Sequence, residues 1–316
     1  MTNILIPKKN VILDASVLSS LMGCARLTDL RYNHNLTAIG GKSNSLECGS
    51  IVHKFLEQYY KSQINGANRA ESVQQARSTA ELYIAGCQGC SEFIPSVEID
   101  RPVCGHQPNE FPGVKNTPPE SEKYAIGWKY ALDTCHQYIE YYKNDHWVSL
   151  EAEVVKGEIL YENDDLRVMW KAKFDWIVDT NDDILPVDHK TMKQRRDKIS
   201  LNNQFTGQCL LMKTRKVVIN KIGFQTTLKP EEKFIREIVN YSSDRLIEWQ
   251  SEILPYYAYK LLDYTEQQHW PPNYTHCENI YGKCQFVSVC EADRNMRGEE
   301  LRLNFIKGSR WDPTND

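Results

Sequence analysis

Four cysteines are divided between the two ends of the chain, and this division limits the folds that the chain can adopt. Cys24 stands near the start, whereas Cys277, Cys284 and Cys290 follow one another near the end. Four thiolates are a donor set of structural Zn²⁺ sites and of iron–sulfur clusters, and the spacing does not separate the two. If all four cysteines bind one such centre, the two ends of the chain must lie side by side.

Composition limits the class of protein. The chain has 316 residues, of which 41% are hydrophobic and 25% charged, so it can bury one large core or two smaller cores in contact. Its sequence has no run approaching the ~18 apolar residues of a membrane helix, and the start, MTNILIPKKNVILDAS, lacks the order of a signal peptide. With ten cysteines and no secretory signal, we expect no membrane contact and a cytoplasmic location, where thiols stay reduced.

Hydrophobic periodicity predicts an ordered series of helices and strands. Apolar residues recur at three- and four-residue steps, which predicts helices at 45–62, 71–86, 123–144 and 201–213. Alternation and short apolar runs predict strands at 147–158, 166–178, 184–190 and 216–228. The turn residues of 179–183 should join the second and third strands in a hairpin. Pro230 should open a long helix that reaches Leu254 or beyond, because proline is favoured in the first turn.

This series predicts an α/β fold with a mixed central β-sheet flanked by helices. We expect a single domain over 1–316, with a mainly helical N-terminal part (1–145), a sheet core (146–228) and a C-terminal helix with the cysteine segment (229–316). The stretch 87–119 is rich in Gly, Pro and Asn and is expected to be irregular. It contains a second group of possible zinc ligands: Cys87, Cys90, Cys104 and His106.

Three polar residues mark the ends of the predicted hairpin strands. Asp175 ends one strand-like segment, Asp188 ends its neighbour, and Lys190 lies two residues farther on. Pairing would bring both carboxylates to one edge of the sheet, with Lys190 on the same strand face as Asp188. The two aspartates and the backbone carbonyl of His189 offer the oxygen ligands that Mg²⁺ prefers, and an ammonium could orient or deprotonate an attacking water. The alternative is a hairpin with ordinary polar residues at its rim.

A group of basic residues follows directly after this motif: Lys193, Arg195, Arg196 and Lys198. The net charge of −4 does not itself indicate nucleic-acid binding, but basic residues gathered beside an acidic metal site can hold phosphates. The position of the group after Lys190 favours DNA binding. A solvated polar loop is the alternative interpretation.

These residues belong to an ordered set of motifs that resembles the PD-(D/E)xK nuclease superfamily, in particular its RecB-type branch and the CRISPR-associated four-cysteine exonucleases. The motifs are LDASVLSSLMGCARL with Cys24, Gly49-Ser-Ile-Val-His53-Lys-Phe-Leu-Glu57, Asp175 with Asp188-x-Lys190, Gln204-Phe-Thr-Gly-Gln208, and the closing trio of cysteines. Together they span most of the chain in the expected order. Two departures are Gln208, where the family has tyrosine, and the wider first interval of the trio.

The resemblance implies a restriction-endonuclease-like core and a metal-dependent DNA exonuclease that acts on single-stranded ends, in recombination, repair or phage DNA metabolism. It implies that His53 binds the metal with Asp175 and Asp188, and an imidazole beside two carboxylates suits Mn²⁺ as well as Mg²⁺. Gln204 would support Lys190 or contact DNA, and Glu153 on the first strand would assist at the metal. Without the motifs, His53 would be an ordinary helix-face histidine and Glu153 an exposed strand residue.

For the four cysteines, the resemblance implies a 4Fe–4S cluster that fastens the C-terminal segment to the first helix, and zinc stays open as the alternative. The chain contains nothing that resembles a nucleotide-binding loop, so a helicase or recombinase partner would be a separate protein. Two other functions stay open. One is a catalytically quiet DNA-binding or recombination-partner protein with the same fold, and the other is a structural protein held together by zinc.

Overall fold

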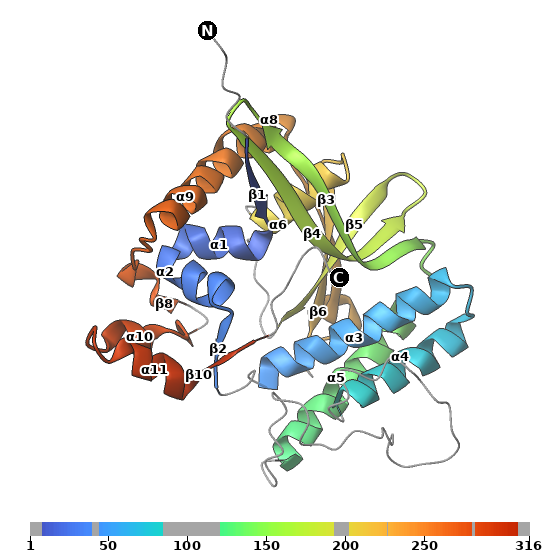
Figure 1. The fold of residues 1–316 in the computed structure, drawn as a ribbon. Helices are drawn as coiled ribbons and strands as arrows, with labels where there is room; N and C mark the ends of the chain where they lie inside the picture. Colours follow the sequence, from blue (N-terminus) through green and yellow to red (C-terminus); the bar gives the residue numbers. More distant parts are fainter. Residues whose placement is uncertain are drawn as a thin grey trace.

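The structure, a computed structural model, describes residues 8–39, 44–84, 121–192, 202–225, 227–279 and 282–308. Within these ranges, six strands form one mixed sheet with helices on both faces (Figure 1). The strands are β1 (Lys9–Leu13), β3 (Val148–Glu162), β4 (Leu166–Asp179), β5 (Ile184–Met192), β6 (Lys216–Gly223) and β7 (Phe234–Asn240). The predicted α/β fold with a mixed central sheet is therefore confirmed.

The hairpin predicted around 179–183 is formed by β4 and β5. These strands pair antiparallel from Trp176–Val187 to Asp179–Ile184. Beyond Trp176–Val187 they separate, because β5 pairs from Val187 onward with β6, in parallel. Asp175 and Asp188 are therefore the first residues past the last pair of the hairpin. β3 pairs antiparallel with β4, β1 pairs in parallel with the start of β4, and β7 pairs antiparallel with β6.

Three helices cover one face of the sheet and match predicted helices: α3 (Asn44–Ile64), α4 (Arg69–Ile84) and α5 (Ser121–Tyr141). α3 packs on the sheet because its apolar residues recur on one side of the helix. The buried residues of α3 include Ile51, Val52, Phe55, Leu56, Tyr59 and Tyr60. They share one core with Trp176 of β4 and Val187 of β5.

The opposite face is covered by α1 (Ala15–Gly23), α6 (Asn203–Leu211), α8 (Ser243–Glu248) and α9 (Leu254–Gln267). Trp170 of β4 is fully buried there and meets Trp249 edge to face, with 5.0 Å between ring centroids. Gly207 of α6 permits this packing, since a Cβ at that position would lie 2.1 Å from Trp170 Nε1. None of the helices that the structure describes is long and apolar enough to cross a bilayer.

The long helix predicted from Pro230 is wrong. Pro230 does open a helix, but α7 (Pro230–Lys233) ends after one turn and the chain continues as β7. Phe234 to Asn240 contains two isoleucines and a valine and pairs with β6 over its whole length, so sheet pairing outweighs the helix-start signal. Helical structure resumes with α8, a π-helix (Trp249–Ile253) and α9. The strand predicted at 216–228 ends earlier, at Gly223, and β1 is an additional strand.

Segments from both ends of the chain meet in a small lobe, which we call the cysteine lobe (Figure 1). It consists of α2 (Ala25–Thr28), a π-helix (Asp29–Asn33), β2 (Leu36–Ala38), a 3₁₀ helix (Tyr274–His276), β8 (Glu278–Asn279), β9 (Gly282–Lys283), α10 (Val287–Glu291), α11 (Arg297–Asn304) and β10 (Phe305–Lys307). β2 pairs antiparallel with β10, and Leu30, Phe286, Val289 and Phe305 form the core of the lobe. The two ends of the chain therefore lie together, as the division of the cysteines predicts.

Candidate active site

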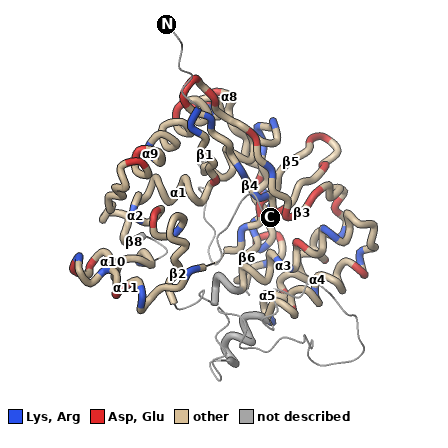
Figure 2. The backbone as a smooth tube through the Cα atoms, viewed as in Figure 1, with Lys and Arg blue, Asp and Glu red and all other residues tan. Residues whose placement is uncertain are grey.

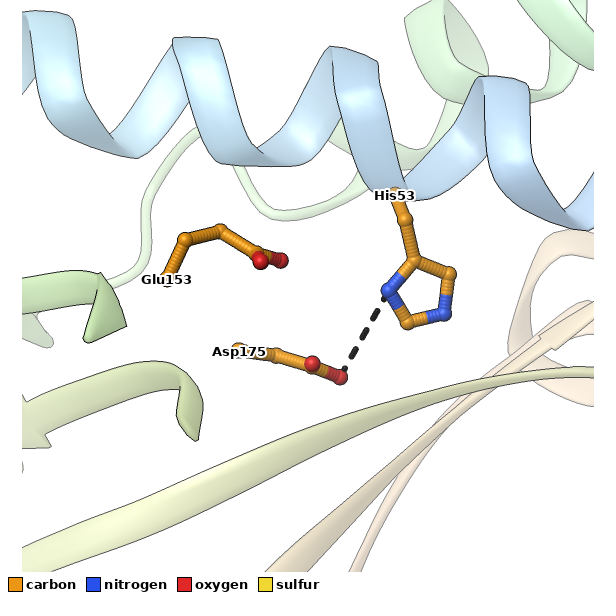
Figure 3. A group of neighbouring side chains, drawn as sticks. All are labelled: His53, Glu153 and Asp175. Carbon is orange, nitrogen blue, oxygen red and sulfur yellow. Dashed lines mark ion pairs between the residues drawn. The ribbon is translucent and has the colours of Figure 1, made fainter. Parts of the chain in front are cut away.

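Three side chains from different elements converge on one point beside the sheet. His53 of α3, Glu153 of β3 and Asp175 of β4 each offer a ligand atom, and these atoms lie within 4.8 Å of one another (Figure 3). His53 Nδ1 lies 3.6 Å from Asp175 Oδ2. One imidazole and two carboxylates are donors that Mn²⁺ and Mg²⁺ accept, so these residues fit a divalent cation.

The close approach of α3 to β5 brings His53 to this point. Gly49 lies one turn before His53 and therefore on the same side of the helix. A Cβ at Gly49 would lie 2.9 Å from Thr191 Oγ1 on β5. A larger residue at position 49 would push the helix away from the strand and carry the imidazole with it, which explains why glycine suits this position.

Glu153 reaches the site through an unusual backbone conformation. It lies in β3 between the pairs Ala152–Trp176 and Val154–Phe174, and hence across from Asp175. Its φ angle of 52° lies in the left-handed region, which costs a non-glycine residue about 1–3 kcal/mol and is typical of functional sites. The side chain is only 10% exposed, and Lys173 Nζ lies 3.0 Å from its carboxylate. This backbone conformation turns the Glu153 side chain towards His53 and Asp175 (Figure 3).

Electrostatics at the site favour a bound cation. Burial and the neighbouring Asp188 carboxylate raise the pKa of Asp175 to about 7, against the opposing effect of His53. The backbone N–H of His189 donates a hydrogen bond to Asp175 Oδ2 at 2.8 Å. The ionised carboxylates of Asp175 and Asp188 repel one another, because little solvent screens them. A divalent cation bound beside them would offset that repulsion. The donor set therefore matches the charge of the ions that it would hold.

Asp188, Lys190 and Gln204 form a second group next to the first. Asp188 is buried, and its Oδ2 lies 2.8 Å from Lys190 Nζ. Gln204, in the first turn of α6, donates from Nε2 to Asp188 Oδ1 at 2.6 Å and accepts from Lys190 Nζ at 3.3 Å. Asn202 caps this helix by accepting from the Gln204 backbone N–H. The structure thus brings together Asp188, predicted as a metal ligand, with Lys190 and Gln204, which were predicted to prepare the water and to support that lysine.

Alternation along β5 separates Asp188 and Lys190 from Leu185, Val187 and His189, and Asp188 is not among the three residues whose ligand atoms converge. Leu185 and Val187 belong to the core under α3 and α5, and His189 continues that row. Asp188 and Lys190 consequently face α6. Asp175 lies where the strands separate, close enough to Asp188 for the two charges to interact. Asp175 therefore lies between His53 on α3 and the group of Asp188, Lys190 and Gln204 beside α6.

The structure does not describe every predicted site residue. Lys193, Arg195, Arg196 and Lys198, and the possible zinc ligands Cys87, Cys90, Cys104 and His106, lie outside the described residues. The metal-ligand role of the His189 carbonyl stays a prediction. Acidic and basic residues are interspersed along β3 and β4 near the site (Figure 2). Lys173, which contacts Glu153, was missed from the sequence, although its alternation with the buried Ala172 and Phe174 was a usable signal.

The four cysteines predicted to share a centre line one small pocket in the cysteine lobe. Cys24, Cys277, Cys284 and Cys290 line it together with apolar residues such as Leu30 and Phe286. Burial and the neighbouring thiols of Cys290, Cys284 and Cys24 raise the pKa of Cys277. Four thiols that line one pocket are a donor set that fits a metal centre.

Polar groups around this pocket also point at the sulfurs. The Asn273 backbone N–H donates to Cys24 Sγ at 3.3 Å, and Arg26 Nη1 donates to Cys290 Sγ at 3.7 Å. The ring of His276 lies against Gly23, where a Cβ would be only 2.5 Å from His276 Nε2. Hydrogen bonds to sulfur stabilise the thiolate form, so Asn273 and Arg26 are further members of the site that the cysteine spacing did not reveal.

A family model described as the PD-(D/E)XK nuclease superfamily matches residues 13–291, which include every described residue of both sites. The chain belongs to the PD-(D/E)XK nuclease superfamily. This membership agrees with the mixed sheet of the structure and with the restriction-endonuclease-like core that the motifs imply. Nucleases of this superfamily use divalent metals, and the group of His53, Glu153 and Asp175 supplies suitable ligands in this nuclease.

Solved structures offer more distant likenesses to this nuclease. A protein from Eubacterium rectale, provisionally named as an exonuclease, is 14% identical, with 90% of this chain and 88% of that chain covered and a TM-score of 0.45. The protein SSO0001 is 18% identical over 55% of this chain and 78% of that chain, with a TM-score of 0.29. A search of the curated proteins gave no match.

Proposed function

We propose that this nuclease is a divalent-metal-dependent DNA exonuclease that hydrolyses phosphodiester bonds at single-stranded ends. The observation that carries the proposal is the convergence of His53, Glu153 and Asp175 within 4.8 Å, on the superfamily's metal motif. The resemblance to RecB-type and four-cysteine exonucleases supports the preference for ends. A role in recombination, repair or phage DNA metabolism rests on the same resemblance.

The residues divide the chemistry between the two groups of the site. His53, Glu153, Asp175 and Asp188 would hold Mg²⁺ or Mn²⁺, which would polarise the scissile phosphate and lower the pKa of an attacking water. Lys190 would orient that water and offset charge on the phosphate as the bond to the leaving oxygen breaks. Gln204 contacts both Asp188 and Lys190 and would hold the two side chains in register. Lys193, Arg195, Arg196 and Lys198 are proposed to bind the DNA backbone.

Digestion of end-labelled DNA tests the reaction. Linear single strands, linear duplexes and circular single strands would be compared with Mg²⁺, Mn²⁺ and EDTA. We expect linear single strands to be degraded with either metal and circular strands to survive. Rapid cutting of circular strands would contradict the exonuclease proposal, and tight DNA binding without any cleavage would favour the catalytically quiet DNA-binding protein instead.

Substitution of Lys190 tests the assignment within the site. Lys190→Ala should abolish cleavage and leave DNA binding largely intact, because the metal ligands remain. Lys216→Ala is a matched control, since Lys216 makes a similar ion pair with Asp183 at the distant hairpin turn. Undiminished digestion by Lys190→Ala would refute the role of this lysine.

We also propose that Cys24, Cys277, Cys284 and Cys290 hold a 4Fe–4S cluster, with zinc as the alternative. The convergence of the four sulfurs on one pocket supports a metal centre of either kind. Purification without oxygen should give brown protein with iron and acid-labile sulfide, whereas colourless protein that carries only zinc would select the alternative. A cytoplasmic location and a separate helicase or recombinase partner complete the proposal.

A further inference from the structure

A row of polar residues crosses three neighbouring strands beneath the active site. His189 of β5 is in register with Asn220 of β6, and Asn220 is in register with Arg236 of β7. His189 and Asn220 are buried, and the Arg236 side chain is only 9% exposed. Tyr138 of α5 lies above the row and is also buried. These four residues contribute hydrogen-bonding groups to a layer that is otherwise apolar.

Hydrogen bonds connect the row into one chain. Asn220 Nδ2 lies 2.8 Å from His189 Nδ1 and donates to the Tyr138 hydroxyl at 2.9 Å. Arg236 Nη2 donates to the same hydroxyl at 3.1 Å, and Arg236 Nη1 makes an ion pair with Asp145. Because Asn220 Nδ2 is the donor in both of its bonds, Nδ1 of His189 is an acceptor, which leaves the ring proton on Nε2.

The charge on Arg236 is held in place by its surroundings. Burial lowers the pKa of Arg236, but Tyr138, Tyr60 and Asp145 together raise it by more. The net pKa is therefore above the ordinary value, and the guanidinium stays charged. The guanidinium carbon lies 3.7 Å from the ring centroid of Tyr142 and 4.2 Å from that of Trp147. Aromatic faces attract such a cation. Arg236 is therefore a fixed donor at one end of the chain of hydrogen bonds.

Packing alone does not account for this chain of polar groups. Among the described residues, His189 Nε2 and Asn220 Oδ1 are buried without a hydrogen-bond partner. Each such atom costs about 1–3 kcal/mol, and apolar residues of similar shape would fill the same layer without that loss. Buried polar groups are retained where they fix one arrangement among several. Here the polar groups lead through Asn220 to the ring of His189.

His189 connects this chain to the metal ligands through its backbone. It lies between Asp188 and Lys190, and its N–H holds Asp175 Oδ2 at 2.8 Å. Its ring lies nearly parallel to those of Tyr60 and Trp176, at interplanar angles of 18° and 28°. Stacking limits the tilt of the ring, while the bond to Asn220 fixes its rotation. Both constraints act on the residue whose backbone N–H bonds to Asp175.

We propose that Arg236, Tyr138 and Asn220 are positioning residues, which hold His189 so that its backbone N–H keeps Asp175 turned towards His53 and Glu153. The inference rests on the proposed function, since Asp175 matters only if it binds the metal. Loss of the chain should let the Asp175 carboxylate rotate, which would weaken the metal site without removing a ligand. Outer residues that orient ligands typically contribute about 10–100-fold to metal affinity.

Two tyrosines one turn apart provide a matched pair of variants. Tyr138→Phe removes the hydroxyl that joins Asn220 to Arg236. Tyr142→Phe removes a hydroxyl that donates to the Phe234 carbonyl at 3.3 Å and does not contact Asn220 or His189. Mn²⁺ binding to the full chain, measured by electron paramagnetic resonance, should weaken about tenfold or more in Tyr138→Phe and stay unchanged in Tyr142→Phe. Equal effects of the two variants would overturn the proposal.

A second measurement reads the His189 ring directly. In metal-free protein labelled with ¹⁵N-histidine, we expect the His189 proton on Nε2. Asn220→Asp replaces the donor with an acceptor, so the proton should move to Nδ1. An unchanged pattern of ¹⁵N shifts in Asn220→Asp would also overturn the proposal, since the chain would then not control the ring.

These outcomes separate this inference from the proposed function. Wild-type protein that binds no Mn²⁺ and cleaves no DNA would refute the proposed function, whatever the ¹⁵N shifts show. Wild-type protein that binds Mn²⁺ and cleaves DNA, with Tyr138→Phe behaving like Tyr142→Phe, would refute only the positioning role.

Discussion

Lys190 Nζ lies 2.8 Å from Asp188 Oδ2, and Gln204 contacts both side chains. Gln204→Ala would remove both contacts without removing any of the proposed metal ligands. We expect kcat to fall by about tenfold or more, with little change in DNA affinity, because supporting residues of metal sites contribute on this scale. Gln267→Ala on the exposed side of α9, where Gln267 donates to Asp263, is the control for loss of a surface amide. Single-turnover kinetics would show an equal loss in both variants if the Gln204 contacts were incidental.

Asp175 should make the stability of the metal-free protein depend on pH. Burial and Asp188 raise its pKa from 3.8 to about 7, so in this window the folded state binds more protons than the unfolded state. The stabilising contribution is present below pH 3.8 and is lost as the pH rises through about 7. In EDTA, the Tm of the wild type should therefore fall relative to Asp175→Asn between these values. A difference in Tm that does not vary with pH would contradict the assignment.

Metal binding should show the opposite trend with pH. The cation binds the ionised carboxylate, so Mn²⁺ affinity should rise with pH until Asp175 is fully deprotonated above about 7. The increase in Tm on adding Mn²⁺ should accordingly be larger at alkaline pH than at acidic pH. Calorimetric titration with release of a proton below the pKa of Asp175 would support this coupling, and its absence would count against Asp175 as a ligand.

Replacement of Glu153 should change both the stability of the fold and the affinity for metal. Glycine tolerates a φ of 52°, so Glu153→Gly should be about 1 kcal/mol more stable to urea than Glu153→Ala, which keeps the strained backbone. Both variants lack the carboxylate and should bind Mn²⁺ more weakly than the wild type. Equal urea stabilities for the two variants would show that the backbone relaxes without cost.

Gly207 should control both the core and the placement of Gln204. A Cβ at position 207 would lie 2.1 Å from Trp170 Nε1, so Gly207→Ala should destabilise the fold by about 1–3 kcal/mol and displace α6. Nuclease activity should fall with it, since Gln204 lies on the same helix. Gly298→Ala is the control: a Cβ there meets no atom within 4 Å, and the helix should gain about 0.5–1 kcal/mol.

The cysteine lobe should depend on its metal. Its core contains four buried apolar residues, Leu30, Phe286, Val289 and Phe305, which is little for a lobe built from two ends of a chain. Cys284→Ser should therefore lose the metal and expose residues 282–308 to proteolysis before the rest of the fold. Cys209→Ala, in which a buried thiol of α6 is removed, should keep the metal content of the wild type. Early proteolysis in both variants would argue against a specific role for the metal.

Local patterns predicted much of the sheet and the helices that carry the site. The turn residues of 179–183 specify the β4–β5 hairpin, and the apolar spacing of α3 places His53 on the side of the sheet. The turn and the helix are each determined by residues that are close together in the sequence. The joining of the two ends followed from the cysteines, since one centre needs all four sulfurs in one place.

Other features depend on contacts that a local pattern does not contain. β7 looks like the continuation of a helix because Pro230 opens one, and only pairing with β6 makes it a strand. Missing β7 also meant missing Arg236, and with it the row that includes His189 and Asn220. The left-handed conformation of Glu153 has no sequence signal, because glutamate rarely adopts it.

Because β2 pairs with β10, the cysteine lobe can finish folding only after nearly the whole chain has been synthesised. Residues 36–38 leave the ribosome long before residues 305–307, so β2 must wait for its partner during most of translation. Cys24 waits in the same way for Cys277, Cys284 and Cys290. The proposed metal centre would then be assembled late, because a ribosome that stops before Cys284 releases a chain without the complete set of four cysteines.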